Sequence, residues 1–138
     1  MGYLQILSGC MFAKKTTELI NLYKEKKEEG ENVLAINYDK DTRYGSNKII
    51  NHDGLSIPCT SIHSLDEIFR LHTTEICDVE YRDYYIDPKV LNAKYIFIDE
   101  AQFFQNLKSF VLTLIEKYDK HIIISGLDLD FRRHTGTG

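Results

Sequence analysis

The run Tyr95-Ile96-Phe97-Ile98 contains no charged residue and ends directly on Asp99-Glu100. A strand with one face in water alternates apolar and polar side chains, so an uninterrupted run predicts a strand buried on both faces of a parallel sheet. The segment His121 to Ser125 also predicts a buried strand. Between these two predicted strands, Leu107 to Tyr118 has the spacing of a helix. This alternation of strand and helix predicts an α/β fold whose ligands bind at the carboxyl ends of the strands.

The rest of the chain gives a coarser prediction. Apolar spacing and turn residues predict a strand at Tyr3–Ser8, a loop at Gly9–Lys15, a helix at Thr16–Glu29 and a strand at Val33–Asn37. Gly30 is a suitable stop for that helix. We expect a polar loop at Tyr38–Gly54, a short helix from a Ser64 cap to Leu71, and a loop at His72–Asn92.

Composition narrows the class of protein. The chain has 138 residues, 43% hydrophobic and 28% charged, which fits one globular domain spanning 1–138 and excludes a disordered tail or a coiled coil. The net charge of −4 argues against a nucleic-acid partner, and no apolar stretch is long enough to span a membrane. Three scattered cysteines and a start that lacks secretory-signal features predict a reducing, cytoplasmic setting.

A candidate phosphate loop lies between the first strand and the first helix. The segment Gly9-Cys10-Met11-Phe12-Ala13-Lys14-Lys15-Thr16 satisfies seven of the eight positions of G-x-x-x-x-G-K-[ST], with Lys14 at the second glycine. In such a loop the backbone N–H groups hold phosphate at a helix N-terminus, the lysine reaches the terminal phosphates, and the threonine hydroxyl ligates Mg²⁺. The same residues also fit a basic helix start that binds no ligand.

The acidic pair at the end of the apolar run is the second candidate. A phosphate-loop enzyme places a Mg²⁺-associated acid here, which is Asp99, and a neighbouring glutamate such as Glu100 can accept a proton from an attacking hydroxyl. The simpler interpretation is that both acids are ordinary surface residues at the end of a strand. Asp99-Glu100-Ala101-Gln102 also resembles a helicase D-E-A-x box, but one small acidic domain is not a helicase motor.

The segment that follows the last predicted strand is the third candidate site. Loops at this edge line the ligand crevice of an α/β sheet. Phe131 can stack on a base and the arginines after it can face phosphate, although such a segment also occurs as ordinary surface.

Four blocks in order resemble the thymidine kinase family of the cellular and poxviral type. Residues 9–20 resemble G-P-M-F-[SA]-G-K-[ST]-T-E-L-[IL], and Lys40–Gly45 with His52–Gly54 resemble K-D-T-R-Y-G and T-H-D-G. Residues 97–104 resemble F-I-D-E-A-Q-F-F, and residues 125–133 resemble S-G-L-D-G-D-F-R-R. The fold implied by this resemblance is a P-loop NTPase-like parallel sheet in RecA-like order, flanked by helices.

The resemblance also implies a reaction and a set of roles. The reaction is transfer of the ATP γ-phosphate to the 5′-hydroxyl of thymidine, with Mg²⁺ as cofactor and Glu100 as catalytic base. Thr16 and Asp99 match the Mg²⁺ site, partly through water. The ATP site would comprise Gly9, Cys10, Met11, Phe12, Ala13, Lys14, Lys15, Thr16, Asp41, Arg43 and Asp99. The thymine pocket would comprise Met11, Phe103, Leu127 and Phe131.

Departures from the family pattern motivate an alternative hypothesis about the function. Lys14 replaces the loop glycine, Cys10 a frequent proline, and Leu129 a small residue. The family's C-terminal zinc and lasso part is expected to be absent, so no zinc site is predicted in this chain. The first hypothesis is therefore a homo-oligomeric kinase, tetrameric by resemblance, that binds ATP and thymidine but neither nucleic acid nor membrane. The second is a degenerate remnant that binds nucleotide or partner subunits without catalysis.

Overall fold

A computed structural model of the chain describes residues 2–7, 12–38, 45–51, 53–62, 64–65, 69–76, 79–86 and 88–126, with only the backbone described at 12–14, 45–47, 69–76 and 79–86. The elements are β1 (Leu4–Leu7), α1 (Phe12–Glu28), β2 (Val33–Tyr38), β3 (Gly45–Ile50), β4 (Ser56–Ile62), β5 (Phe69–Ile76), β6 (Val79–Ile86), α2 (Pro88–Asn92), β7 (Tyr95–Asp99), η2 (Ala101–Phe103), α3 (Leu107–Tyr118) and β8 (His121–Ser125). None of these helices is long and apolar enough to cross a lipid bilayer.

Six strands form one mixed sheet in the order β1-β8-β7-β2-β4-β3. All neighbours pair in parallel except β3, which runs antiparallel to β4 at the edge. Strand β7 lies between β8 and β2, so its backbone is hydrogen-bonded on both sides. The predicted α/β sheet is confirmed, and β8 separates β1 from the strand that ends in Asp99.

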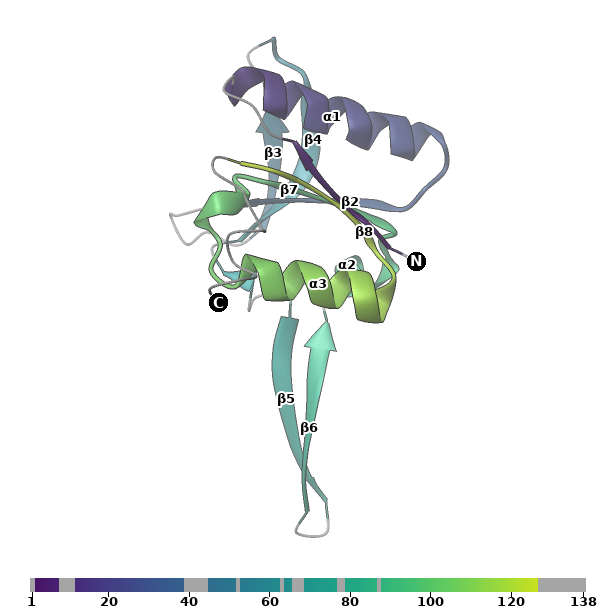
Figure 1. Ribbon diagram of the computed structural model, residues 1–138, viewed down its shortest axis with the longest axis vertical. Coiled ribbons are helices and arrows are strands. Elements are labelled where there is room, and N and C mark those ends of the chain that lie inside the picture. The colour runs from purple at the N-terminus through teal and green to yellow at the C-terminus, as the bar shows by residue number, and fades with distance from the viewer. Residues whose placement is uncertain are drawn as a thin grey trace.

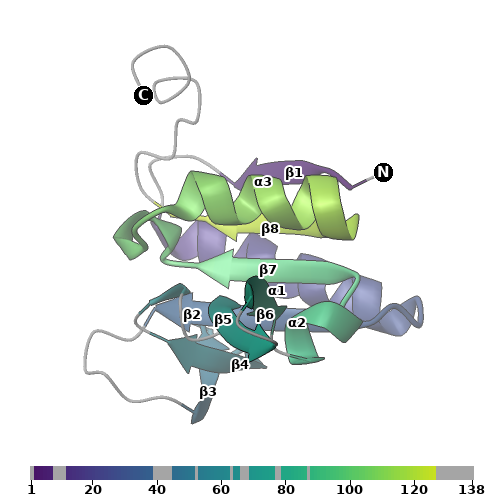
Figure 2. The same cartoon turned by 90° about the horizontal axis from the view of Figure 1, so that it is seen from below.

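Helices cover both faces of this sheet. In Figure 1, α1 lies on one face, and α2 and α3 lie on the other. Figure 2 views the molecule from the α3 side, with α3 running beside β8 and β1. The uninterrupted apolar run in β7 has a simple cause, because Phe97 packs toward α1 while Ile96 and Ile98 pack toward α3, and all three side chains are fully buried.

The two faces therefore carry separate cores. The α3-side core consists of Ile36, Ile62, Leu65, Val90, Ala93, Ile96, Ile98, Ala101, Phe104, Leu107, Phe110, Val111, Leu114, Ile122 and Ile124. The α1-side core consists of Leu7, Leu19, Ile20, Tyr23, Ala35, Ile49, Ile57, Cys59, Phe97 and Ile123. Within the α1-side core the Tyr23 and Phe97 rings meet edge to face, with centroids 5.5 Å apart.

The C-terminal end of α1 confirms the role predicted for Gly30. This residue has φ of 86°, a left-handed conformation that glycine adopts without a Cβ penalty. The amide N–H of Gly30 donates to the Lys27 carbonyl and that of Glu31 donates to the Lys26 carbonyl, each at 3.1 Å. These two bonds form a Schellman motif, which satisfies the last carbonyls of the helix.

The N-terminal end of α1 differs from the prediction. The helix begins at Phe12 and not at Thr16, so the predicted loop at Gly9–Lys15 is wrong over its last four residues. Residues 12–15 are Phe-Ala-Lys-Lys, which includes strong helix formers and no glycine. With Lys14 at the second loop glycine, the local sequence favours helix where a phosphate loop would still be turning.

Two predicted loops contain strands. The Tyr38–Gly54 prediction is wrong at β3, whose Gly, Ser, Asn and Lys residues have low strand propensity and which pairs with β4 as an edge strand. The His72–Asn92 prediction is wrong at β5, β6 and α2. Strands β5 and β6 form a separate two-stranded ribbon that extends away from the main sheet (Figure 1). The sequence between β5 and β6 contains none of the dipeptides typical of a hairpin turn, so it gave no signal of this ribbon.

The predicted helix from Ser64 to Leu71 is also wrong at its end, because residues 69–71 belong to β5. A capping pattern is a local signal, and the pairing of β5 with β6 overrides it. The remaining strand and helix predictions are confirmed to within two residues at each end, and Leu107–Tyr118 and His121–Ser125 match at both.

Helix α3 provides a matched test of the α3-side core. Leu114 is fully buried, whereas Leu112 on the same helix is 39% exposed. We expect Leu114→Ala to lower the free energy of unfolding by about 2–5 kcal/mol, because it leaves a cavity in the core. Leu112→Ala should change it by less than about 0.5 kcal/mol. Urea unfolding followed by circular dichroism measures both, and equal losses would contradict the packing described.

Candidate active site

The carboxyl ends of the parallel strands bring one row of polar residues together. Asn37 lies opposite Asp99 on one side and opposite Ser61 on the other. Ile98 lies opposite Ile124, so Asp99 and Ser125 each follow that pair by one residue. Because side chains alternate along a strand, all four share the face of Ala35, Cys59, Phe97 and Ile123, which α1 covers. The beginning of α1 and this polar row (Ser61, Asn37, Asp99, Ser125) therefore lie at the same edge.

Lys15 and Thr16 occupy the first turns of α1. Both are buried, at 4% and 7% exposure. The Lys15 ammonium group donates a hydrogen bond to the carbonyl oxygen of Gly126, 3.1 Å away, at the exit of β8. A lysine enclosed at the N-terminal end of a helix creates a local positive site in a chain that is acidic overall.

Asp99 is the acid of this row. It is only 8% exposed. Burial raises the pKa of its carboxyl to about 6, and the negative charge of Glu100 adds to the rise. The backbone N–H of Glu100 and the ammonium of Lys15 act in the opposite direction, so the carboxylate and the lysine lie close enough to interact.

Glu100 turns the chain out of β7 into η2. Its backbone is left-handed, with φ of 55° and ψ of 39°, which is uncommon for a residue other than glycine and is found at functional sites. The Gln102 side-chain amide donates to the Glu100 carboxylate at 3.0 Å. Neighbouring positions thus provide one carboxylate that is buried and one that is partly exposed and oriented by an amide.

Phe103 presents an aromatic surface beside the two acids. Its side chain is 54% exposed and stacks on the Tyr38 ring, with centroids 5.1 Å apart. Phe104 is buried, and its ring meets the Tyr38 ring edge to face, with centroids 5.3 Å apart. Since Tyr38 ends β2 and Phe103 ends η2, the exposed ring lies at the same edge as Asp99.

The structure does not describe every residue predicted for the site. Lys15, Thr16, Asp99, Glu100 and Phe103 are described, and they gather at one edge. Phe12, Ala13 and Lys14 are described only as helical backbone. The following predicted residues lie outside the described part of the chain: Gly9, Cys10, Met11, Asp41, Arg43, Leu127 and Phe131.

Sequence reasoning missed Asn37, Ser61 and Ser125. Each is a polar residue at or next to the end of a strand, and that position was the available signal. Cys59 lies two residues before Ser61 on the same face, and burial raises the pKa of its thiol to about 11. The Ser61 hydroxyl opposes that rise and the charge of Asp99 adds to it. Burial therefore keeps the Cys59 thiol protonated at neutral pH.

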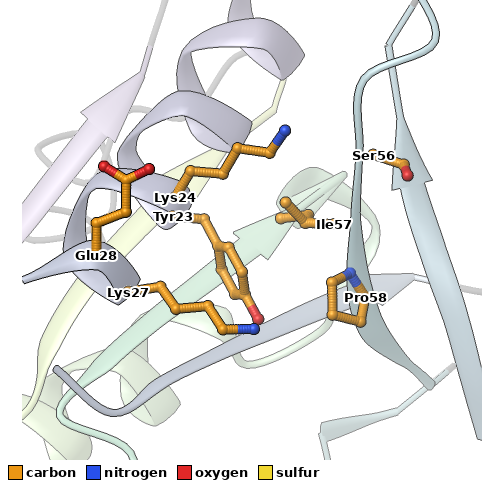
Figure 3. A pocket seen from close by; sticks show the side chains of 7 residues that line it. All are labelled: Tyr23, Lys24, Lys27, Glu28, Ser56, Ile57 and Pro58. Carbon is orange, nitrogen blue, oxygen red and sulfur yellow. The ribbon is translucent and has the colours of Figure 1, made fainter. Parts of the chain in front are cut away.

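A cavity of about 420 Å³ lies elsewhere, between the second half of α1 and the start of β4 (Figure 3). Its lining residues are Tyr23, Lys24, Lys27, Glu28, Ser56, Ile57 and Pro58. None of them belongs to the polar row or to the first turns of α1. This cavity is therefore separate from the candidate active site.

The oxygen ligands at this edge of the sheet fit a hard cation that also binds phosphate. Carboxylate and hydroxyl oxygens are the ligands that Mg²⁺ prefers, and it usually keeps several water ligands. Asp99 and Thr16 provide one of each. Within the described residues no group of three or more His, Cys, Asp or Glu side chains is gathered.

The buried charge on Asp99 predicts a pH-dependent stability. At pH 7.5 the folded chain holds an ionised carboxylate whose pKa is raised from 3.8 to about 6, which destabilises the fold relative to a neutral side chain. Asp99→Asn should raise the free energy of unfolding by up to about 3 kcal/mol at pH 7.5. The gain should shrink as the pH falls from about 6 to 4, where the wild-type carboxyl becomes protonated. Urea unfolding at several pH values measures this, and a gain independent of pH would contradict it.

Comparison with known proteins identifies the family. A family model described as thymidine kinase matches residues 2–137. The thymidine kinase of Oryza sativa subsp. japonica is 33% identical over 96% of this chain and 45% of its own length. Thymidine kinase a of Arabidopsis thaliana is 31% identical over 97% of this chain and 51% of its own length. The thymidine kinase of Rabbit fibroma virus (strain Kasza) is 34% identical over 96% of this chain and 63% of its own length.

The chain spans about half the length of the plant relatives it matches. The family model nevertheless covers the strands of the main sheet and all the residues that gather at the candidate active site. On the family model, which spans all but one residue at each end, the chain belongs to the thymidine kinase family.

Proposed function

We propose that this chain transfers the γ-phosphate of ATP to the 5′-hydroxyl of thymidine. The observation that carries the proposal is the meeting of Lys15 and Thr16 on α1 with Asp99 and Glu100 at the end of β7. The relatives named thymidine kinase support the nucleoside as acceptor. By the same resemblance we propose a cytoplasmic homo-oligomer.

Each described residue has a distinct part in this reaction. The Lys15 ammonium would leave the Gly126 carbonyl, 3.1 Å away, to bind phosphate oxygens. Thr16 and Asp99 would hold Mg²⁺, which neutralises charge on the phosphates when bound. Although burial raises the pKa of the Asp99 carboxyl to about 6, the group is ionised at neutral pH and available to a cation. The residues outside the described part, Asp41, Arg43 and the backbone of residues 9–11, would complete the phosphate site.

Glu100 is the proposed base. As the 5′-oxygen of thymidine forms a bond to the γ-phosphorus, the bond from that phosphorus to the β–γ bridging oxygen breaks and ADP leaves. The proton of the 5′-hydroxyl passes to the Glu100 carboxylate. The Gln102 amide orients that carboxylate. Phe103 would contact the base of the nucleoside through its exposed ring, with Met11, Leu127 and Phe131 as further lining residues.

A second function is favoured by one observation. Helix α1 runs back through Lys14, the position of the second glycine in a phosphate loop. A helical backbone there directs fewer free N–H groups at a phosphate than a loop does. The alternative is a chain that binds nucleotide weakly and transfers no phosphate. Calorimetry with Mg-ATP and a transfer assay together separate the two functions.

Glu100→Gln tests the base directly. It keeps the shape of the side chain and removes the proton acceptor, so transfer of labelled γ-phosphate to thymidine should fall by about 10²–10⁴-fold. Mg-ATP affinity, measured by calorimetry, should stay within about twofold of wild type because Glu100 has no part in phosphate binding.

The matched control for this test is Glu116→Gln, on an exposed position of α3. It should leave transfer unchanged. Full activity in Glu100→Gln would exclude the base role.

Lys14→Gly tests the altered loop position. Glycine costs about 1 kcal/mol in a helix, which favours release of residues 12–14 from the helix into a loop around phosphate. We expect Mg-ATP to bind about tenfold more tightly, as measured by calorimetry. Lys14→Ala, which removes the charge but keeps the helix, should not tighten binding. Weaker binding in Lys14→Gly would mean that the lysine charge compensates for the missing glycine.

A further inference from the structure

Asn51 joins the end of β3 to the beginning of α1. It is a polar residue with only 7% exposure. Its side-chain amide donates to the Thr17 hydroxyl at 3.0 Å, a contact between residues 34 positions apart. Figure 1 shows the β3–β4 hairpin beside the beginning of α1.

The same side chain also shapes the turn between β3 and β4. Its carbonyl oxygen accepts from the backbone N–H of Asp53 at 3.0 Å and from that of Leu55 at 2.9 Å. The backbone N–H of Asn51 donates to the Leu55 carbonyl at 2.9 Å, and that of Gly54 donates to the Asn51 carbonyl at 3.2 Å. The turn is therefore tightly organised around one residue.

The two halves of the Asn51 amide have separable tasks. Among the described residues, the turn bonds of this amide are made by its carbonyl oxygen, and an aspartate makes the same kind of turn. The NH₂ group donates to Thr17 instead. An asparagine at this position thus provides a donor directed at α1 in addition to a turn.

Thr17 directly follows Lys15 and Thr16. Because consecutive residues of a helix are rigidly related, holding the Thr17 hydroxyl sets the position of the two residues before it. We propose that Asn51 is a positioning residue that fixes the phosphate-binding end of α1 through Thr17. The phosphate-binding part of this statement rests on the proposed function, whereas the effect on the helix does not.

Thr17→Val is the cleanest variant, because it removes the acceptor, keeps the shape of the side chain and leaves the turn bonds of Asn51 in place. We expect the Kd of Mg-ATP, measured by calorimetry on the full chain, to rise about tenfold. The Kd of thymidine should change by less than about twofold, since a positioning effect is confined to the phosphate end. Thr17→Ser keeps the hydroxyl and should restore Mg-ATP affinity.

A double-mutant cycle separates the contact from the turn. Asn51→Ala removes both, so it should weaken Mg-ATP binding at least as much as Thr17→Val does. In the Asn51→Ala background, Thr17→Val should cause a smaller further loss than it does in the wild-type background. A further tenfold loss there, or unchanged Mg-ATP affinity in Thr17→Val alone, would overturn the proposal.

Amide hydrogen exchange of residues 12–19 without nucleotide gives a readout independent of binding. Exchange should speed up about tenfold in Thr17→Val and return to the wild-type rate in Thr17→Ser. If the unaltered chain binds no Mg-ATP, the proposed function fails and the exchange rates alone decide the positioning role. Unchanged exchange in Thr17→Val would reject it.

Discussion

The parallel pairing of β7 with β8 and β2 is the constraint on which the site depends. Strand β7 pairs with β8 on one side and β2 on the other, and helices cover both faces of the sheet, so its side chains can be apolar on both faces. The pairing also fixes where β7 ends relative to its neighbours. Asp99 is consequently placed beside Asn37 and next to the exit of β8, under the beginning of α1. A shift of one residue would turn Asp99 to the other face.

This placement buries the Asp99 carboxylate, which costs free energy because a charged group loses its hydration. Desolvation is the largest cause of the raised pKa of the Asp99 carboxyl, and the charge of Glu100 raises that pKa further. Lys15 offsets only part of the penalty, and its ammonium also donates to the Gly126 carbonyl. An ionised carboxylate buried in this way destabilises the fold. Under the proposed function, a cation held by Asp99 and Thr16 would relieve that penalty and couple ligand binding to stability.

Helix α1 carries the other half of the site and is held at both ends by different means. Gly30 ends it with a Schellman motif, while Asn51 holds Thr17 near its beginning. Between these ends Leu19, Ile20 and Tyr23 pack on the sheet in the α1-side core. The hydrophobic contacts fix the axis of the helix over the sheet. The hydrogen bond from Asn51 adds a directional restraint close to Lys15, which apolar packing does not provide.

The sequence by itself determined the parallel sheet, the buried strand ending in Asp99-Glu100 and the glycine stop of α1. These are set by local patterns of polarity and backbone preference. Only the tertiary structure decided that Ser61, Asn37 and Ser125 join Asp99 in one row, that β3 and the β5–β6 ribbon are strands, and that Asn51 reaches Thr17. The physical reason is that register and side-chain contact depend on which distant segments meet, and no local pattern in those segments encodes the partner.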